Sequence, residues 1–389
     1  MQIYLDNSAT TRICDEALEV YTRVSKEQFG NPSSLHGAGL FAERELDRAR
    51  GEILASLGMR RGNVFFTASG TEANNLAIIG RALSKERYKR GAKIIITDSE
   101  HASVSAPCEY LMKLGFKVAK IPTRGGVIDL SALERELTED TVLVSCMLVN
   151  NETGAVYNIP EAARLTKGRA KDALVHTDAT QAYMKIPFTK DGLGVDMITV
   201  SSHKIEGPKG VGALITDTDV MTKKALAPIV FGGGQELGLR SGTENVPGVA
   251  AFGEAVRIGR ASVSERYKAM SEMRDYLISK LSSELSEDVL TVTRPPEHAP
   301  NIINVTAHGI KSETLLHYLS KSDIYVSSGS ACSSNARHTS SALLAYGKSE
   351  AEADASIRIS LSHRTTKSEL DLFTEALKSG IASLARIKK

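Results

Sequence analysis

Seven short apolar runs between residues 60 and 216 constrain the fold of this chain more than any other feature of its sequence. They alternate with amphipathic stretches, which is typical of strands and crossover helices that form a mostly parallel sheet. Because the runs are apolar throughout, we expect both faces of the sheet to be buried. The intervening periodicity predicts helices such as 104–114 and 130–137, the second with Ser131 as a candidate N-cap. The predicted strands are 64–66, 93–97, 117–121, 142–149, 174–177, 197–200 and 211–216.

The sequence changes character after about residue 253, and this predicts a second, smaller α+β domain. At 389 residues the chain is long enough for two or three structural units. We expect a large domain of residues 14–255 and a small domain formed by residues 1–13 and 256–389. The predicted elements of the small domain are a long helix at 254–285, strands at 289–292 and 302–306, a helix at 312–319, a Ser/Gly-rich loop and a final helix at 367–387.

Charge and cysteine content exclude several classes of protein. The chain has 48 basic and 46 acidic residues, which is too balanced for the electrostatic attraction that drives nucleic-acid binding. We interpret the basic run 85–93 as a solvated helix end. No stretch has the pattern of a signal peptide or a membrane span. The four cysteines lie far apart, so we expect no metal site and no redox dithiol, and a reducing, cytoplasmic location.

Two charged residues follow predicted strands, where ligands of open α/β sheets bind. Lys204 comes after strand 197–200, and partial burial there would lower the pKa of its amine and let it attack a carbonyl. Asp178 comes after strand 174–177 and could keep a pyridine nitrogen protonated, the state in which pyridoxal phosphate (PLP) accepts electrons. Taken singly, a surface lysine and a helix cap are the simpler interpretations.

A turn and a histidine follow two further strands. Residues 67–75 turn from a strand into a helix, so the backbone amides of Gly70 and Thr71 could bind a phosphate. His101 follows strand 93–97 and could stack on a flat ring or transfer protons. A simple cap and an ordinary loop histidine are the alternatives. Lysine, aspartate, turn and histidine after successive strands of one sheet together favour a shared site.

Ordered motifs along nearly the whole chain resemble those of one enzyme family. They are YLDNSATT at 4–11, FGNPSSLH at 29–36, SGTE at 69–72, NNETG at 150–154, DATQ at 178–181, SHK at 202–204, RSGT at 240–243 and SSGSAC at 327–332. The chain resembles the PLP-dependent cysteine desulfurases of the NifS/IscS type, in the class V aminotransferase group of fold type I. The resemblance implies an α/β fold with a mainly parallel seven-stranded sheet flanked by helices and a smaller α+β domain.

The resemblance also implies roles around the PLP ring. Lys204 would form the Schiff base with PLP, Asp178 would pair with the pyridine nitrogen, and His101 would stack on the ring. Gln181 and Asn151 would approach the ring oxygen, and Asn151 would also lie near the substrate.

Further implied residues bind phosphate and substrate. Thr71, Ser201 and His203 would hold the phosphate. Thr243 would reach it from the partner subunit of a homodimer. Arg358 would bind the substrate carboxylate, a task suited to the two parallel hydrogen bonds of a guanidinium.

Cys332 distinguishes sulfur chemistry from ordinary transamination. Its surroundings, 327–334, are small polar residues that pack poorly, as expected for a nucleophile that must reach a buried substrate and later present sulfur at the surface. The expected reaction converts L-cysteine to L-alanine and leaves a persulfide on Cys332. We expect Cys14, Cys108 and Cys146 to be small buried hydrophobes.

Two departures from the family pattern leave alternatives open. Phe231 and Leu237 stand where the family commonly has a histidine and an arginine. The chain also lacks the longer C-terminal tail with which some members dock an iron-sulfur scaffold. The alternatives are a selenocysteine lyase, another class V enzyme such as an aminotransferase, and a PLP-retaining sulfur-relay or interaction subunit without turnover. The sulfur acceptor is open among an iron-sulfur scaffold, a tRNA-thiolating enzyme and a dedicated carrier.

Overall fold

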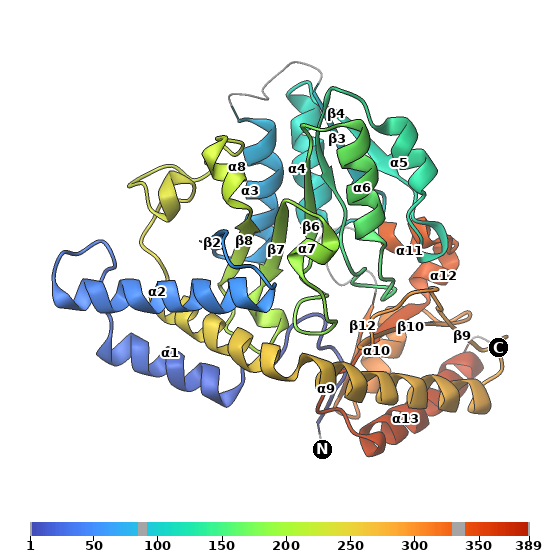
Figure 1. Cartoon of the computed structure of the whole chain (residues 1–389). Helices are drawn as coiled ribbons and strands as arrows, with labels where there is room; N and C mark the ends of the chain where they lie inside the picture. Colours follow the sequence, from blue (N-terminus) through green and yellow to red (C-terminus); the bar gives the residue numbers. More distant parts are fainter. Residues whose placement is uncertain (1, 85–91, 329–338, 388–389) are drawn as a thin grey trace.

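A seven-stranded sheet flanked by helices lies at the centre of the larger half of the computed structural model, which describes residues 2–84, 92–328 and 339–387 (Figure 1). The strands occur in the order β2-β8-β7-β6-β5-β3-β4. Neighbouring strands are parallel except at β8, which is antiparallel to β2 and β7. The predicted mostly parallel sheet is therefore confirmed. Its strands are β2 (Asn63–Thr67), β3 (Lys93–Thr97), β4 (Lys117–Ile121), β5 (Thr141–Ser145), β6 (Leu174–Asp178), β7 (Met197–Ser201) and β8 (Gly212–Thr216).

Two local predictions for this sheet were wrong. The predicted strand 142–149 ends at Ser145, and the apolar residues after it line the sheet end before Val149 bridges back to Val156. The N-cap of helix α5 (Leu130–Glu136) is Asp129, whose Oδ1 accepts a hydrogen bond from the amide of Ala132 at 2.8 Å. Ser131 lies inside the first turn, where its hydroxyl is past the capping position.

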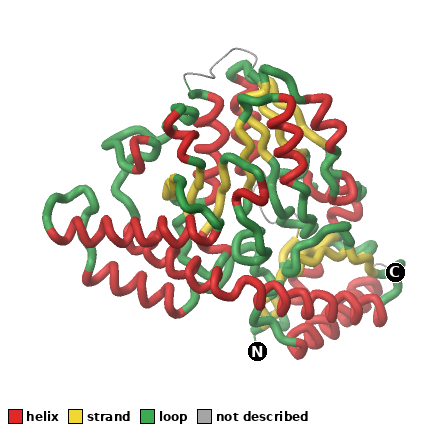
Figure 2. Tube along the Cα trace, viewed as in Figure 1, coloured by secondary structure: helices red, strands yellow, loops and turns green. Residues whose placement is uncertain are grey.

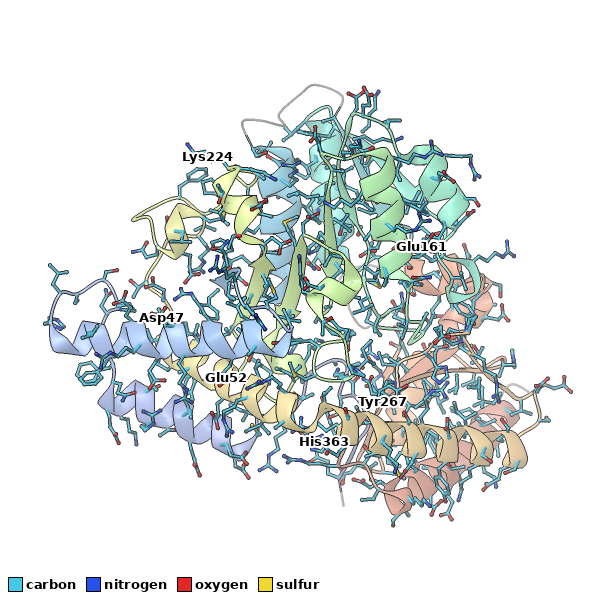
Figure 3. The ribbon with its side chains drawn as sticks, viewed as in Figure 1. Asp47, Glu52, Glu161, Lys224, Tyr267 and His363 are labelled. Carbon is cyan, nitrogen blue, oxygen red and sulfur yellow. The ribbon has the colours of Figure 1, made fainter. Side chains whose placement is uncertain are left out.

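Helices cover both faces of the sheet (Figures 1 and 2). The N-terminal helices α1 (Asp15–Glu27) and α2 (Gly37–Ser56), for which we had no prediction, pack on the long helix α9 (Val246–Glu284). Glu52 of α2 faces α9 and accepts a hydrogen bond from Arg260 at 3.0 Å (Figure 3). The helices between the strands are α3 (Gly70–Ala82), α4 (Ala102–Lys113), α5, α6 (Ile159–Arg169) and α7 (Lys190–Leu193). The single turn η2 (Ser202–Lys204) follows β7, and α8 (Thr218–Thr222) follows β8.

The smaller half contains a four-stranded antiparallel sheet in the order β12-β13-β10-β9. The N-terminal strand β1 (Ile3–Tyr4) lies in this half, where it pairs in parallel with β11 (Ile324–Tyr325). The first residues of the chain are therefore fixed to its last third. The other elements are β9 (Leu290–Val292), β10 (Ile302–Ala307), β12 (Ser327–Ser328), β13 (Ser356–Ser360), α10 (Ser312–Ser320), α11 (Ser341–Tyr346), α12 (Glu350–Asp354) and α13 (Lys367–Ile387).

Helix α9 joins the two halves as one continuous element of 39 residues. It begins eight residues before the predicted start, because the side chain of Asn245 caps the amide of Gly248 and Pro247 occupies the first turn. Its first part contributes Phe252 to the core of the larger half, and its last part contributes Leu277 to the core of the smaller half. In the described part of the chain, no helix combines the length and the apolar character that crossing a membrane requires.

Candidate active site

A cavity of about 350 Å³ lies beside the carboxyl ends of β6 and β7 and the first turn of α3. Ten of the twelve predicted site residues line it, and they come from both halves of the molecule. Thr243 is exposed outside this lining, and Cys332 lies outside the described residues. The ten are Gly70, Thr71, His101, Asn151, Asp178, Gln181, Ser201, His203, Lys204 and Arg358.

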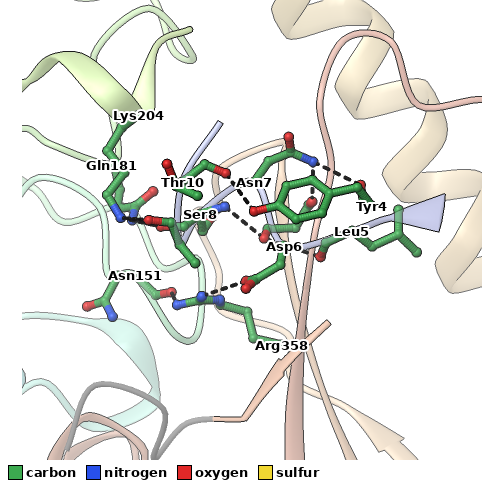
Figure 4. Close-up of polar contacts among 12 residues, drawn as sticks. Tyr4, Leu5, Asp6, Asn7, Ser8, Thr10, Asn151, Gln181, Lys204 and Arg358 are labelled. Atoms are coloured by element: carbon green, nitrogen blue, oxygen red, sulfur yellow. Dashed lines mark hydrogen bonds and ion pairs between the residues drawn. The ribbon is translucent and has the colours of Figure 1, made fainter. Parts of the chain in front are cut away.

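Lys204 reaches the cavity from the single turn that follows β7. Its Nζ donates hydrogen bonds of 2.6 Å each to the backbone carbonyls of Ser8 and Ala9 (Figure 4). Carbonyl oxygens are good partners for an ammonium group. The lysine is thus held at the sheet end by the N-terminal residues, whose role the sequence analysis had not recognised.

Asp178 is the last residue of β6 and is buried. Its Oδ2 accepts a hydrogen bond from Asn74 Nδ2 at 2.7 Å, and its Oδ1 accepts one from the amide of Thr180 at 2.9 Å. The second bond is a turn contact, and Asp178 is no N-cap of the described helices. The carboxylate is therefore fixed in one orientation at the edge of the cavity.

The start of α3 fits an anion. Ser69 caps this 13-residue helix by accepting a hydrogen bond from the amide of Glu72 at 3.2 Å. A Cβ at Gly70 would lie 3.2 Å from Ser201 Cβ, so the helix start approaches the end of β7 closely. Ser201 Oγ is buried there without a hydrogen-bond partner among the described residues. Helix amides beside an unpaired hydroxyl suit a ligand with several acceptor oxygens, such as a phosphate.

The two cavity histidines are neutral near pH 7. Burial lowers the pKa of His101, although the charge of Asp178 opposes this shift. Burial also lowers the pKa of His203 to about 4. His101 Nδ1 accepts a hydrogen bond from the amide of Ser103 at 3.1 Å, at the start of α4. A proton on neutral His101 therefore resides on Nε2.

Gln181 is oriented by partners at both ends of its amide. Its Nε2 donates a hydrogen bond to the carbonyl of Ser8 at 2.9 Å, and its Oε1 accepts one from Lys185 Nζ at 3.2 Å. Lys185 is buried, and burial lowers its pKa to about 7. No site role was predicted for Lys185. The available signal was a single charge inside the otherwise apolar run 182–188.

Arg358 reaches the cavity from β13 of the smaller half. Its Nη1 donates a hydrogen bond to the carbonyl of Asn151 at 2.9 Å, and its Nη2 forms an ion pair with Asp6 Oδ1 at 3.0 Å (Figure 4). Arg358 Nε is buried without a hydrogen-bond partner among the described residues. Asp6 also lines the cavity. Asp6 belongs to the motif YLDNSATT at 4–11, but no role was predicted for its carboxylate.

The remaining cysteines behave as expected. Cys14, Cys108 and Cys146 are buried with free thiols, and burial raises the pKa of each, to about 12 for Cys108. Because a raised pKa keeps a thiol protonated, a nucleophilic thiolate is disfavoured at these three positions. No cluster of potential metal ligands occurs in the described residues.

Comparison with known proteins gives consistent matches over nearly the whole chain. Residues 3–373 match the family model described as aminotransferase class-V. The cysteine desulfurase IscS of Dictyoglomus turgidum is 36% identical over 387 residues, which cover 99% of this chain and 96% of that protein. A solved structure described as a NifS-like protein has a TM-score of 0.90 at 36% identity and covers 99% of this chain and 100% of its own. A structure described as SspA in complex with cysteine has a TM-score of 0.79 at 30% identity, covering 94% of this chain and 100% of its own.

Proposed function

The chain belongs to the aminotransferase class-V family, and on this premise we propose that it is a PLP-dependent cysteine desulfurase that converts L-cysteine to L-alanine. The observation that carries the proposal is the convergence of Lys204, Asp178 and Arg358 on one cavity. The relatives at 36% identity that are named cysteine desulfurase and NifS-like protein support the same activity.

The residues of the cavity fit PLP. The first amides of α3 at Gly70 and Thr71, with the unpaired hydroxyl of Ser201, suit the phosphate. The fixed carboxylate of Asp178 suits the ring nitrogen, and Lys204 supplies the amine that would hold the aldehyde carbon. When bound, PLP supplies an electron sink that stabilises negative charge at the substrate Cα.

The side chains of this chain supply binding and proton transfer. Arg358 offers the substrate carboxylate a guanidinium whose position is set by Asn151 and Asp6. Lys204 lies at the sheet end, where an amine can take a proton from Cα and return it. His101, neutral and fixed at Nδ1, presents Nε2 for a hydrogen bond.

Cys332 is proposed as the nucleophile that takes the sulfur atom from the substrate. Its thiolate attacks the sulfur of L-cysteine, the carbon–sulfur bond breaks, and the released carbon takes a proton to give L-alanine. The enzyme keeps both sulfur atoms as a persulfide, so L-cysteine and one thiol become L-alanine and one persulfide without an added oxidant or reductant. The outer sulfur of the persulfide would pass to an acceptor, which is an iron-sulfur scaffold, a tRNA-thiolating enzyme or a dedicated carrier.

A homodimer is the proposed assembly, with Thr243 reaching the phosphate site of the partner. Phe231 and Leu237 are 81% and 74% exposed, and Phe29 and Leu35 are also exposed. The loops that carry them project on the same side of the molecule, near the outer end of α2 (Figure 1). A group of exposed large apolar side chains is typical of an interface.

Two further assignments complete the proposal. Residues 14–255 and residues 1–13 with 256–389 are proposed as the two domains, supported by the separate hydrophobic cores of the two halves. A cytoplasmic location is supported by the free thiols of the described cysteines.

The desulfurase activity is tested by incubating PLP-loaded protein with L-cysteine and a reductant and measuring L-alanine and sulfide. We expect Cys332→Ser to bind PLP normally and lose nearly all turnover, whereas the buried control Cys108→Ala keeps it. Borohydride should attach PLP to Lys204. Full activity of Cys332→Ser would favour another class V reaction, and PLP binding without alanine formation would favour the non-catalytic alternative. A much higher kcat/KM for L-selenocysteine would indicate a selenocysteine lyase.

The shared site is tested by mixing the inactive variant Lys204→Ala with Thr243→Ala, a variant in which we expect PLP to bind more weakly. If Thr243 serves the partner subunit, each mixed dimer has one site with both defects and one with neither. About half of the activity per mixed dimer should then return. No recovery after demonstrated subunit exchange would assign Thr243 to its own subunit.

A further inference from the structure

Asp6 is a second carboxylate that lines the cavity, where it pairs with Arg358. Its side chain is 19% exposed, and that of its partner Arg358 is 6% exposed. Burial raises the pKa of Asp6, while the charges of Arg358 and Lys204 oppose this rise. An ion pair so well shielded from water acts on a nearby ligand more strongly than a surface pair does.

The backbone fixes Asp6 relative to Arg358. Asp6 forms a bridge with Ser360, two residues beyond Arg358 on β13. The next residue, Asn7, donates hydrogen bonds to the carbonyl of Ser360 from its backbone amide at 3.2 Å and from its side chain at 2.9 Å. Ser8 adds a third bond to Ser360 Oγ at 2.9 Å. These contacts fix the backbone at Asp6, and the ion pair with Arg358 holds its carboxylate in the cavity.

Four of the described residues that line the cavity carry a charge, and with PLP bound Lys204 would be taken up by the cofactor, which leaves Arg358 as the cation available to a substrate carboxylate. Lys204 and Arg358 are cations, Asp6 and Asp178 are anions, and the two histidines are neutral. Asp178 is held by the amide of Asn74 and a backbone amide, whereas Asp6 pairs with Arg358. A substrate carboxylate that approaches Arg358 therefore also approaches the negative charge of Asp6.

We propose that Asp6 is a specificity-determining residue that restricts the cavity to amino acids with an uncharged side chain. An amino acid of this kind brings one carboxylate, to which Arg358 donates hydrogen bonds from its remaining N–H groups. A second negative group in the substrate side chain would add repulsion from Asp6 inside a shielded cavity. The inference rests on the proposed function, because it takes Arg358 as the group that binds the substrate carboxylate.

Asp6→Asn tests this inference, because asparagine keeps the shape and an acceptor oxygen for Arg358 and removes the charge. The probes are L-alanine, with a neutral side chain, and L-aspartate, with a second carboxylate. Titration calorimetry on the PLP-loaded protein measures the Kd of each. We expect the ratio of the L-aspartate Kd to the L-alanine Kd to fall about tenfold in Asp6→Asn.

The matched control is Asp275→Asn, which removes the charge of an aspartate 3.1 Å from Arg274 on α9, outside the cavity. Its ratio should equal that of the wild type. Asp6→Ser, which removes the charge with a smaller side chain, should shift the ratio in the same direction if Asp6→Asn folds poorly.

An unchanged ratio in folded Asp6→Asn or Asp6→Ser would overturn the inference, and so would equal weakening of both ligands, which would leave Asp6 as a positioning residue only. Wild-type protein that binds neither amino acid would overturn it as well. Failure of the proposed function is seen separately, as absence of L-alanine formation from L-cysteine by the wild type.

Discussion

The cavity has two walls of different construction. The sheet-end wall consists of Asp178, Gln181, Ser201 and Lys204, which lie within one stretch of chain at the ends of two neighbouring parallel strands. The junction wall consists of Asp6, Asn151 and Arg358, whose contacts join residues 352 and 207 positions apart. Local sequence and strand order place the sheet-end wall, where the carbonyls of Ser8 and Ala9 then hold Lys204. The junction wall exists only through the meeting of distant segments.

The difference in construction matches a difference in proposed work. The sheet-end wall follows β6 and β7 of the large sheet and holds the groups proposed for chemistry. The junction wall is held by polar contacts and contains the groups proposed for substrate binding. We therefore expect substitutions in the sheet-end wall to lower kcat and substitutions in the junction wall to raise KM.

The largest expected effect tests the sheet-end wall through Asp178→Asn. The change removes the fixed charge proposed to pair with the ring nitrogen, so kcat for L-cysteine should fall on the order of 10² to 10³-fold. The control is Asp98→Asn, because Asp98 also follows a strand and accepts a hydrogen bond from Thr123 at 2.7 Å but does not line the cavity. Equal kcat values for the two variants would break the comparison.

Arg358→Lys tests the junction wall. A lysine cannot keep both the bond to the carbonyl of Asn151 and the ion pair with Asp6. The KM for L-cysteine should rise about tenfold to a hundredfold, with a smaller change in kcat. Arg164→Lys is the matched control, because Arg164 also makes two side-chain bonds, to Glu161 on the outer surface (Figure 3). A fall in kcat without a rise in KM would place Arg358 with the chemical groups instead.

Lys185→Met sharpens the comparison through the pH dependence of stability. The pKa of Lys185 is about 7 in the folded chain, below its value in the unfolded chain, so the unfolded chain binds more protons between about pH 7 and pH 10. This group therefore makes wild-type stability rise with pH across that window. The quantity compared is the free energy of unfolding of Lys185→Met minus that of the wild type. This difference should be about 2 kcal/mol larger at pH 7 than at pH 9.

Urea unfolding at pH 7 and pH 9 measures this difference. A difference between variant and wild type that does not change with pH would mean that Lys185 keeps an ordinary pKa behind the sheet-end wall.

The smallest expected effect concerns the attachment of the junction wall. Asn7→Ala removes the side-chain bonds to the carbonyls of Tyr4 and Ser360 from a buried position. The free energy of unfolding should fall by about 1 kcal/mol. Asn63→Ala, which loses only long contacts of 3.4 and 3.5 Å, should change it by less than about 0.5 kcal/mol. Similar losses in both would contradict a special role of residue 7 in attaching this wall.

The two walls also differ in how far the sequence predicts them. The apolar runs predict the sheet, and residues placed just after those runs, such as Asp178 and Lys204, must lie at its carboxyl end. Local pattern was sufficient there because strand order and side-chain position are set within a few residues. It failed at residue 131, where one position decides which side chain caps a helix.

The junction wall could not be derived in this way. Arg358 was assigned by family resemblance, and Asp6 received no role, because their pairing depends on the alignment of β1 with β11 and of residue 6 with β13. No local period in the sequence encodes an alignment between segments 352 residues apart. Lys185 was missed for another reason, since its burial becomes apparent only after the turn behind Gln181 is placed.

The hydrogen bonds between the first residues and Ser360 also bear on the biosynthesis of the protein. Ser8 meets Ser360 only after 352 further residues have been added, which at about 5 to 20 residues per second takes roughly 20 to 70 seconds. During translation the large sheet has time to form, while the arginine proposed to bind the substrate has not yet been made. A nascent or prematurely terminated chain therefore carries the proposed reactive lysine without the arginine proposed to bind the amino acid, and we expect sulfur chemistry only when synthesis is nearly complete.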